Sequence, residues 1–372
     1  MHLNDLPTPS AIADLDRFER NADRMAARAH ELGVRLRPHV KTHKCVEAAR
    51  MQVKGHFGGI TVSTLAEARG FADSGFRNIT YAVPVAPQKL PEAIEIGSTI
   101  DHLAVLVDHI ITIQAIEEIS ASNSIRLPVW LKIDSGLNRA GVNPESERAV
   151  VLAARLAGSR NIDFRGVLTH AGQSYEATCE TEVLSVAREE VAVTRAFIKR
   201  LAEAKIEVPE VSIGSTPTIS AAKSLDGIDE VRPGNYVFFD IFQASIGSCT
   251  LSDIAFSILA TVVSVHPEEQ RAVIDSGALA LSKDPGPTHV DPDCGFGRIV
   301  AVEDQHPLPG IRLTSISQEH GEIRGPGTAA LRPGTRLRIL PNHSCLAAAC
   351  FERYHVVRGT EIVDQWRPFR GW

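Results

Sequence analysis

The sequence predicts an α/β protein, a (β/α)8 barrel followed by a C-terminal antiparallel β-domain. Short β-rich runs alternate with helical stretches over the first two-thirds of the 372 residues, as in a parallel sheet with crossover helices. After Asp240, strand-like runs follow one another with little helix between them, which is typical of antiparallel sheet. The chain contains no GxGxxG turn of a doubly wound dinucleotide-binding sheet.

The predicted barrel consists of eight strands separated by helices. In chain order the strands cover residues 35–41, 59–64, 79–83, 103–107, 129–133, 164–169, 210–213 and 236–240. Helical patterns lie between them, including residues 65–75 and a long helix over residues 180–204. Eight such units within about 230 residues match the usual size of a (β/α)8 barrel. We therefore predict a barrel domain over residues 1–244.

The remaining residues, 245–372, are predicted to form the β-domain. Runs such as AFSILATVVSVH, GRIVAV and TRLRILP are strand-like, and they are separated by turn-forming clusters such as KDPGPTHVDPDCGFG. This domain would carry any site residues that lie late in the chain.

Composition narrows the class of protein. The formal net charge of −6 argues against a nucleic-acid partner, which usually requires a basic excess. No apolar run reaches the length of a membrane span or a signal peptide. The six cysteines are scattered without a CxxC pair, which fits a reducing compartment. We expect a cytoplasmic enzyme with no membrane partner.

The first candidate for catalysis is Lys41. Active sites of (β/α)8 barrels lie at the C-terminal ends of the strands, and the first predicted strand ends in RPHVKTHK, with Lys41 in register after apolar Val40. A lysine there could be an ordinary solvated residue. Burial and neighbouring cations would lower its pKa and allow it to form an imine with a carbonyl cofactor. His39 and His43 are possible general bases.

Two later loops are candidates for binding phosphate. The seventh predicted strand runs into GSTP at residues 214–217, where small residues expose backbone N–H groups and two hydroxyls. The segment RPGNY at residues 232–236 precedes the eighth. Each could be a plain turn, but loops after strands seven and eight form the usual phosphate site of such barrels. The candidate residues are Ser215, Thr216, Gly234, Asn235 and Tyr236.

Strands five and six also end in polar residues. The fifth continues into KIDSGLNRAG, where Arg139 is either a surface arginine or directed into the barrel mouth. The sixth ends in THAGQSY, where His170 and Tyr175 could face a planar ring.

Taken together, these segments resemble the fold-type III, alanine-racemase-like pyridoxal-phosphate enzymes. LPTPSAIADLDRFERNADRM followed by RPHVKTHK is similar to their opening, and more narrowly to the D-threonine aldolase and D-serine dehydratase branch. KIDSGLNRAG resembles the family's K-x-D-x-G-x-x-R-x-G segment, and IGSTPT and RPGNYVFFD resemble its two phosphate-binding segments. The similarity runs in order along essentially the whole chain.

The resemblance implies roles for these residues. Pyridoxal 5'-phosphate would be the cofactor, Lys41 its Schiff-base lysine, and Arg139 the partner of its phenolic oxygen. The β-domain would complete the site, commonly across a homodimer. The residues that would hold the cofactor and its phosphate are Tyr175, Thr216, Gly234 and Asn235.

A candidate metal site lies in PNHSC at residues 341–345. On a strand, His343 and Cys345 would point to one face. Such a pair can be incidental, but it is similar to the metal-binding His-x-Cys or His-x-Asp of the branch. Imidazole and thiolate favour zinc, and manganese or magnesium are less suited to sulfur. Two protein ligands leave positions open for water and substrate.

The resemblance implies a lyase that acts on small D-3-hydroxy amino acids, with two reactions open. Cleavage of the Cα–Cβ bond of D-threonine or D-3-hydroxyaspartate gives glycine and an aldehyde. Elimination from D-serine or D-threo-3-hydroxyaspartate gives a keto acid and ammonia. The tail from HSCLAAACFERYHVV to WRPFRGW favours the aldolase, whereas a cysteine ligand also suits the dehydratase. An amino-acid racemase is a third alternative.

Two readings from other classes are disfavoured. A barrel metallohydrolase would need several His or Asp ligands at strand ends, and the chain offers only His39 and His43. A small cofactor carrier would lack the second domain.

Overall fold

The computed structural model describes residues 2–372. The chain divides into two compact units. The first comprises the chain up to Arg24, Thr178–Glu180 and Asn235–Pro368, and the second comprises Met25–Ala177, Thr181–Gly234 and Phe369–Trp372. The first unit thus combines both ends of the chain.

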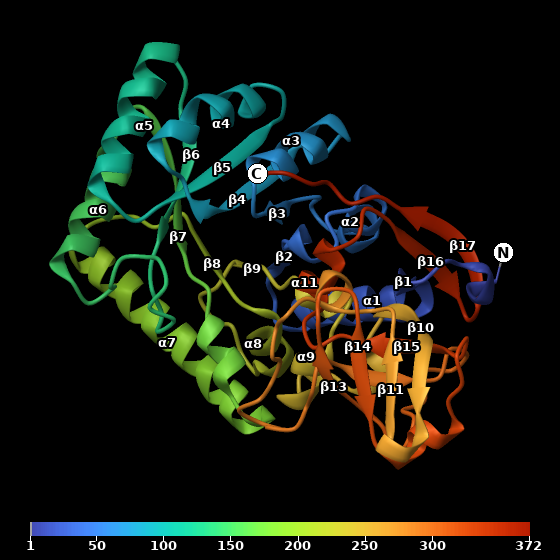
Figure 1. Cartoon of the computed structure of the whole chain (residues 1–372). Coiled ribbons are helices and arrows are strands. Elements are labelled where there is room, and N and C mark those ends of the chain that lie inside the picture. Colours follow the sequence, from blue (N-terminus) through green and yellow to red (C-terminus); the bar gives the residue numbers. More distant parts are fainter. Residues whose placement is uncertain (1) are drawn as a thin grey trace. The chain divides into compact units, whose positions relative to one another are not determined.

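The second unit is a barrel of eight parallel strands, as predicted (Figure 1). Its sheet has the order β2-β9-β8-β7-β6-β5-β4-β3. A parallel bridge between His39 and Thr61 joins the β2 segment to β3 and closes the barrel. The strands are β2 (Arg35–Leu36), β3 (Ile60–Val62), β4 (Asn78–Pro84), β5 (His102–Val107), β6 (Leu127–Lys132), β7 (Ile162–Leu168), β8 (Glu210–Ile213) and β9 (Glu230–Val231).

Both faces of these strands are buried, which explains their continuous apolar runs. On β5 and β6, Val105 and Leu131 belong to the large core shared with the helices. The alternate residues Leu106 and Trp130 belong to a separate small cluster. This two-residue alternation places one set of side chains under the helices and the other inside the barrel.

Helices connect the strands and surround them (Figure 1). Several start at side chains that cap the helix: the Thr64 hydroxyl accepts the Glu67 N–H at 3.0 Å, and Ser146 caps the helix that follows it. The helices are α1 (Leu15–Glu31), α2 (Val46–Val53), α3 (Leu65–Asp73), α4 (Leu90–Gly97), α5 (Ile110–Asn123), α6 (Glu147–Gly158), α7 (Glu180–Glu203) and α8 (Thr216–Ala221).

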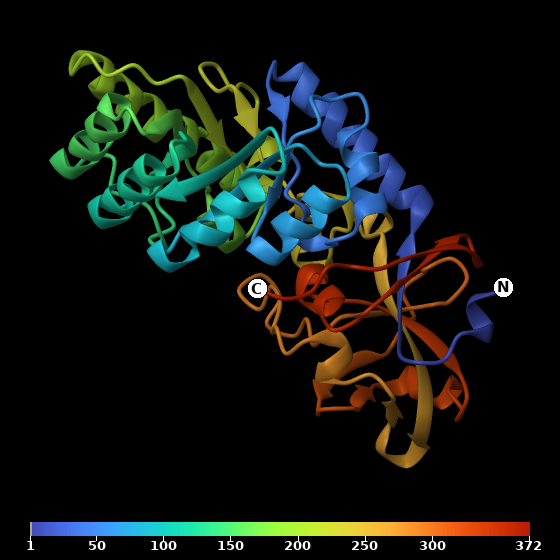
Figure 2. The same cartoon turned by 90° about the horizontal axis from the view of Figure 1, so that it is seen from above.

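The first unit contains a nine-stranded, mostly antiparallel sheet, which confirms the antiparallel sheet predicted for the C-terminal part of the chain. Strands β10 and β11 form an antiparallel hairpin (Figure 2). The strands are β1 (Ser10–Asp14), β10 (Phe256–His266), β11 (Arg271–Ile274), β12 (Arg298–Val300), β13 (Arg312–Ile316), β14 (Gly321–Arg324), β15 (Arg336–Leu340), β16 (Tyr354–Arg358) and β17 (Glu361–Trp366). Its short helices are α9 (Ile241–Ser245), α10 (Ala278–Leu281) and α11 (Ser344–Ala349).

The structure corrects the predicted eighth strand. Residues 236–240 begin in a 3-10 helix, Asn235–Val237, and the eighth strand is β9. The apolar run YVFFD is buried by aromatic packing in the first unit, where Phe238 stacks on Phe256 with ring centroids 4.9 Å apart. A short apolar run does not distinguish a buried strand from another buried segment.

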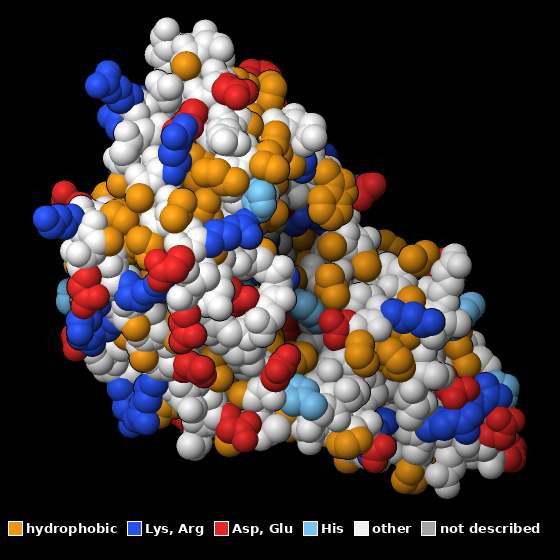
Figure 3. Space-filling view, turned by 90° about the vertical axis from the view of Figure 1, so that its left-hand side faces the viewer, with side chains coloured by type: hydrophobic (Ala, Val, Ile, Leu, Met, Phe, Trp, Pro, Cys, Tyr) orange, Lys and Arg blue, Asp and Glu red, His pale blue; other side chains and the backbone are white. Residues whose placement is uncertain are grey.

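In the part of the chain that the structure describes, no helix is both long and apolar enough to cross a membrane. Lys and Arg side chains are interspersed with Asp and Glu on the face shown in Figure 3. None of the six cysteines, all of which lie within residues 2–372, is in a disulfide bond.

Candidate active site

Lys41 lies at the C-terminal edge of the first barrel strand, in a 3-10 turn (Val40–Thr42) rather than in the strand as predicted. The extended chain before the turn is paired on both sides. The Thr61 N–H donates to the Pro38 carbonyl, and the His39 N–H donates to the Pro233 carbonyl, both at 2.9 Å. The Nδ1 atom of His39 accepts the Lys41 N–H at 3.4 Å. The Lys41 side chain is exposed from this turn.

The two predicted phosphate loops meet beside this segment. The backbone at Gly214 has a φ of +109°, which favours glycine, and buried Ser215 caps α8. The Gly234 N–H donates to the Thr216 hydroxyl at 3.3 Å. A Cβ atom on Gly234 would lie 2.7 Å from the His39 carbonyl oxygen. The loops therefore form a close-packed cradle of small residues.

Positive charge gathers around this cradle while the imidazoles stay neutral. Burial, followed by the charges of Arg232 and Arg139, lowers the pKa of Lys132 to about 8. Burial, and then Lys41 and other cations, holds the pKa values of His39 and His170 well below their usual range. Cationic amines and guanidiniums beside imidazoles of lowered pKa suit an anionic ligand.

His170, Arg139 and Tyr175 follow the fifth and sixth strands as expected. The His170 Nδ1 atom contacts the Gly214 carbonyl at 3.2 Å, which links the sixth strand to the phosphate loop. Arg139 is exposed, and its charge acts on His170. Tyr175 is half-buried in a 3-10 helix, Gly172–Glu176. Their roles toward a planar ring remain predictions.

His43 differs from His39 in its surroundings. Its side chain is fully buried, the Nδ1 atom accepts the Cys45 N–H at 3.0 Å, and Nε2 contacts the Gln52 side-chain oxygen at 2.7 Å. Burial lowers the pKa of His43 to about 4. This geometry favours His43 as a residue that positions the Lys41 turn, and its catalytic role remains a prediction.

Sequence reasoning missed two buried charged residues at the barrel mouth. Glu190 accepts the Ala171 N–H at 3.1 Å and the Gly214 N–H at 3.0 Å, so it ties together the loops after β7 and β8. Arg232 donates to the Ser212 hydroxyl and the Thr169 carbonyl. A signal for Glu190 existed, because it interrupts the buried stripe of α7. The stripe consists of Val183, Ala187, Glu190, Thr194, Phe197 and Leu201.

The predicted metal ligands lie together in the first unit. His343 is the N-cap residue of α11 and Cys345 lies in its first turn, so the predicted strand geometry is wrong. A turn into a helix still brings the two side chains together, and they hydrogen-bond to each other. Burial opposes protonation of His343, but hydrogen bonds to Asp284 and Cys345 outweigh it and raise its pKa to about 11.

Both residues have further partners in this unit. The His343 Nδ1 atom lies 3.0 Å from the Asp284 carboxylate. The Asn235 amide donates to Asp240 at 2.8 Å and approaches the Cys345 sulfur at 3.6 Å. Asn235 and fully buried Tyr236 therefore belong to the same unit as the predicted metal ligands, and their cofactor contacts remain predictions.

The donor set fits a divalent cation with open coordination positions. Within residues 2–372, no group of three or more His, Cys, Asp or Glu side chains could hold a metal. An imidazole next to a thiol is a donor pair that zinc accepts, and a catalytic metal keeps positions for water or substrate. His343 and Cys345 could supply two ligands.

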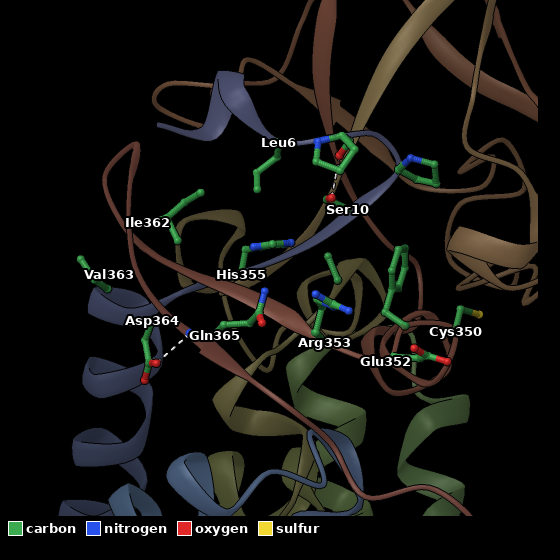
Figure 4. A pocket seen from close by; sticks show the side chains of 14 residues that line it. Leu6, Ser10, Cys350, Glu352, Arg353, His355, Ile362, Val363, Asp364 and Gln365 are labelled. Carbon is green, nitrogen blue, oxygen red and sulfur yellow. Dashed lines mark hydrogen bonds between the residues drawn. The ribbon is translucent and has the colours of Figure 1, made fainter. Parts of the chain in front are cut away.

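The first unit also contains a groove of about 720 Å³, which is a less suitable candidate for the active site. It lies over β16 and β17, and Arg353, His355 and Gln365 are among its lining side chains (Figure 4). Neither His343 nor Cys345 is among the described residues that line it.

Two known domain families match the chain, one over the barrel and one over the part that follows it. The alanine racemase N-terminal domain matches residues 13–241, and a putative serine dehydratase domain matches residues 255–357. The chain belongs to the alanine-racemase-like family. The predicted family is thereby confirmed.

Similar proteins align along almost the whole chain. A D-threo-3-hydroxyaspartate dehydratase of Delftia sp. is 40% identical over 99% of this chain and 98% of its own. A D-serine dehydratase of Dictyostelium discoideum is 34% identical over 100% and 98%. A D-threonine aldolase of Arthrobacter sp. is 27% identical over 96% and 91%. Dehydratases and aldolases of this kind are lyases, and the chain is a lyase.

Solved structures agree with the fold. A cysteine-to-alanine mutant of D-threo-3-hydroxyaspartate dehydratase in the metal-free form has a TM-score of 0.95 and 38% identity, covering 100% of both chains.

Proposed function

We propose that the protein is a pyridoxal-phosphate-dependent lyase that dehydrates a small D-3-hydroxy amino acid to a keto acid and ammonia. The observation that carries this proposal is the identity of 40% and 34% with two dehydratases, against 27% with an aldolase. The sequence alone favoured aldol cleavage, which stays the second candidate because of the Arthrobacter relative. Both reactions lie within the predicted lyase function.

The barrel residues fit the cofactor. Lys41 would bind it covalently, Arg139 would contact its phenolic oxygen, and the cradle of Ser215, Thr216 and Gly234 would hold its phosphate. When bound, pyridoxal phosphate supplies an electron sink for the charge that develops at Cα. The amine of Lys41 would remove the α-proton. Lys132 and Arg232 would offset the negative charge of the phosphate and the substrate carboxylate.

The residues of the first unit fit the metal. His343 and Cys345 would hold a divalent cation, zinc by preference and manganese or magnesium otherwise, which supplies Lewis acidity toward the β-hydroxyl. The α-proton and the β-hydroxyl leave as water. Hydrolysis of the unsaturated product takes up one water and releases ammonia, so a keto acid and ammonia form from the amino acid without net loss or gain of atoms.

A product assay tests this proposal. The enzyme is incubated separately with D-serine, D-threo-3-hydroxyaspartate and D-threonine, and keto acid, ammonia, glycine and aldehyde are measured. We expect keto acid and ammonia in equal amounts from at least one of the first two, and none with Lys41→Ala. Glycine and aldehyde in their place would establish the aldolase. A change of configuration alone would establish a racemase.

The family resemblance and the composition also support a homodimer that works in the cytoplasm on a small D-amino acid, without nucleic-acid or membrane partners.

A further inference from the structure

The Asp284 carboxylate is held in a fixed orientation. One oxygen, Oδ1, accepts the Gly286 N–H at 2.8 Å in a local turn. The other, Oδ2, lies 3.0 Å from Nδ1 of His343. Both side chains are partly shielded, with 21% of Asp284 and 34% of His343 exposed. Each carboxylate oxygen therefore has its own partner.

The backbone near Asp284 packs against Asn342, the residue that precedes His343. The Asn342 amide donates to the Gly295 carbonyl at 2.8 Å and reaches the Asp284 carbonyl at 3.5 Å. A Cβ atom on Gly286 would come within 2.5 Å of the Asn342 side chain. Asn342 thus contacts the backbone of Asp284, and the next residue, His343, contacts its side chain.

This contact decides which nitrogen of His343 is available to a metal. Zinc binds a neutral imidazole, so His343 gives up one of its two ring protons when the metal binds. A neutral imidazole has one N–H donor and one acceptor nitrogen. An ionised carboxylate only accepts, so the proton lies on Nδ1 and the lone pair lies on Nε2. Histidine ligands of metals commonly donate their other N–H to a carboxylate, which fixes the tautomer and the ring orientation.

We propose that Asp284 is a positioning residue for the metal site: it holds His343 as the Nδ1–H tautomer, so that Nε2 is the metal-binding nitrogen beside Cys345. This inference rests on the proposed function, in which His343 and Cys345 bind the cation. It adds a residue that sequence reasoning did not select, 59 positions away from His343.

The decisive variant is Asp284→Asn. The Asn carbonyl oxygen can keep the hydrogen bond to the Gly286 N–H, so the turn and the side-chain shape are retained. The amide NH2 then faces Nδ1 of His343, which must accept, and the proton moves to Nε2. A purely structural role of Asp284 would tolerate this substitution. Asp284→Ala removes the hydrogen bond to Nδ1 of His343 without placing a donor in front of that nitrogen.

Asp291→Ala is a matched control in the same loop. The Asp291 carboxylate accepts the Asp293 N–H at 3.0 Å in an equivalent turn, whereas the carboxylate partner of His343 is Asp284. His343→Ala is a second control, which lacks the imidazole proposed to bind the metal. Cofactor-loaded protein, stripped of metal, is titrated with Zn2+ against a chromophoric chelator, and thermal unfolding verifies the fold of each variant.

We expect Asp284→Asn and Asp284→Ala to bind Zn2+ roughly 10- to 100-fold more weakly than the wild type, and Asp291→Ala to bind normally. In 1H–15N spectra of the zinc-saturated wild type, the single ring proton of His343 should lie on Nδ1, with Nε2 free of a proton. Normal affinity in both Asp284 variants, or equal weakening in Asp291→Ala, would overturn the inference while the metal site stands. Normal affinity in His343→Ala would instead overturn the metal site itself.

Discussion

Two neighbouring lysines at the barrel mouth differ in what surrounds them. Lys44 forms an ion pair with buried Glu67, with Nζ and Oε1 2.8 Å apart, whereas Lys41 is exposed next to the cradle of small residues. We therefore expect Lys41→Ala to abolish covalent cofactor binding and the associated visible absorbance, with the fold intact. Borohydride reduction and peptide mapping check this, with Lys44→Ala as the control. A pyridoxyl label on Lys44 would refute the assignment.

Removing the metal should separate the two halves of the proposed chemistry. In the proposed function, His343 and Cys345 would serve the β-hydroxyl through the metal, whereas Lys41 would hold the cofactor. We expect EDTA treatment to abolish turnover of D-3-hydroxy amino acids and to leave the visible absorbance of the bound cofactor unchanged. His343→Ala and Cys345→Ala should behave in the same way, and added zinc should restore only the wild type. Full turnover by enzyme verified to be metal-free would show that this pair is not a metal site.

What the sequence reveals at the residue scale depends on separation along the chain. The position of Lys41 at the barrel mouth could be predicted because it follows a recognisable strand end, and the proximity of His343 and Cys345 because they are two residues apart. Asp284 could not, because it lies within a cluster of turn-forming residues and its partner is distant in sequence. Arg232 was part of a predicted loop, but nothing local indicated that it is buried.

At the scale of elements, the barrel seam depends on a buried ion pair. Strands β2 and β9 pair over only two residues each, and between them Arg37 Nε lies 2.7 Å from buried Glu230. Losing one partner of a buried pair typically costs ~3–5 kcal/mol. We expect Arg37→Met to lower the free energy of unfolding by that order in urea titrations. Arg155→Met, in a solvent-exposed pair with Glu117, should leave the free energy of unfolding nearly unchanged, because exposed ion pairs contribute little.

The buried pair of Arg37 and Glu230 also predicts how the free energy of unfolding depends on pH. Burial opposes ionisation of Glu230, but Arg37 and the Ser212 hydroxyl outweigh it and hold its pKa below the ordinary value of 4.5. A carboxyl with a lowered pKa contributes stability above its unfolded value and loses that contribution as pH falls through the folded value. The difference in unfolding free energy between wild type and Arg37→Met should therefore be largest above pH 4.5 and shrink in acid. A constant difference would contradict this origin.

The strands that could be predicted from sequence are those whose apolar runs are buried on both faces. Strands β3 to β8 lie at or within two residues of their predicted bounds. The eighth strand was misplaced because β9 is only two residues long and begins with Glu230, whereas the more apolar run after it packs elsewhere. Burial depends on the fold, so a run of apolar residues does not reveal which core it enters.

At the scale of the whole molecule, the first unit joins segments from both ends of the chain. Strand β1 pairs antiparallel with β10 and parallel with β16. The predicted boundary at residues 244 and 245 follows the change in local pattern, and such a pattern cannot show that residues 10–14 complete a sheet formed more than 240 positions later. Pairing of this kind is non-local, and only the three-dimensional structure reveals it.

Assembly is the remaining prediction at this scale. Helices α10 and α11 lie against each other, and they expose Leu279 and Leu346, which are 58% and 44% accessible. Leu346 directly follows Cys345. Exposed apolar side chains grouped beside a functional site commonly mark an interface, and a self-complementary patch on a homodimer contacts its symmetry-related copy. We therefore expect this surface to be buried between two copies of the chain.

Sedimentation velocity of the wild type at micromolar concentration should show a dimer, and the double substitution Leu279→Asp with Leu346→Asp should shift it toward monomer, because two carboxylates would have to be desolvated at the contact. Val151→Asp is the matched control, since Val151 is equally apolar and 60% exposed but belongs to α6 of the barrel. This control should remain dimeric. An active wild-type monomer would refute the dimer, and an intact dimer in the double variant would move its interface to another surface.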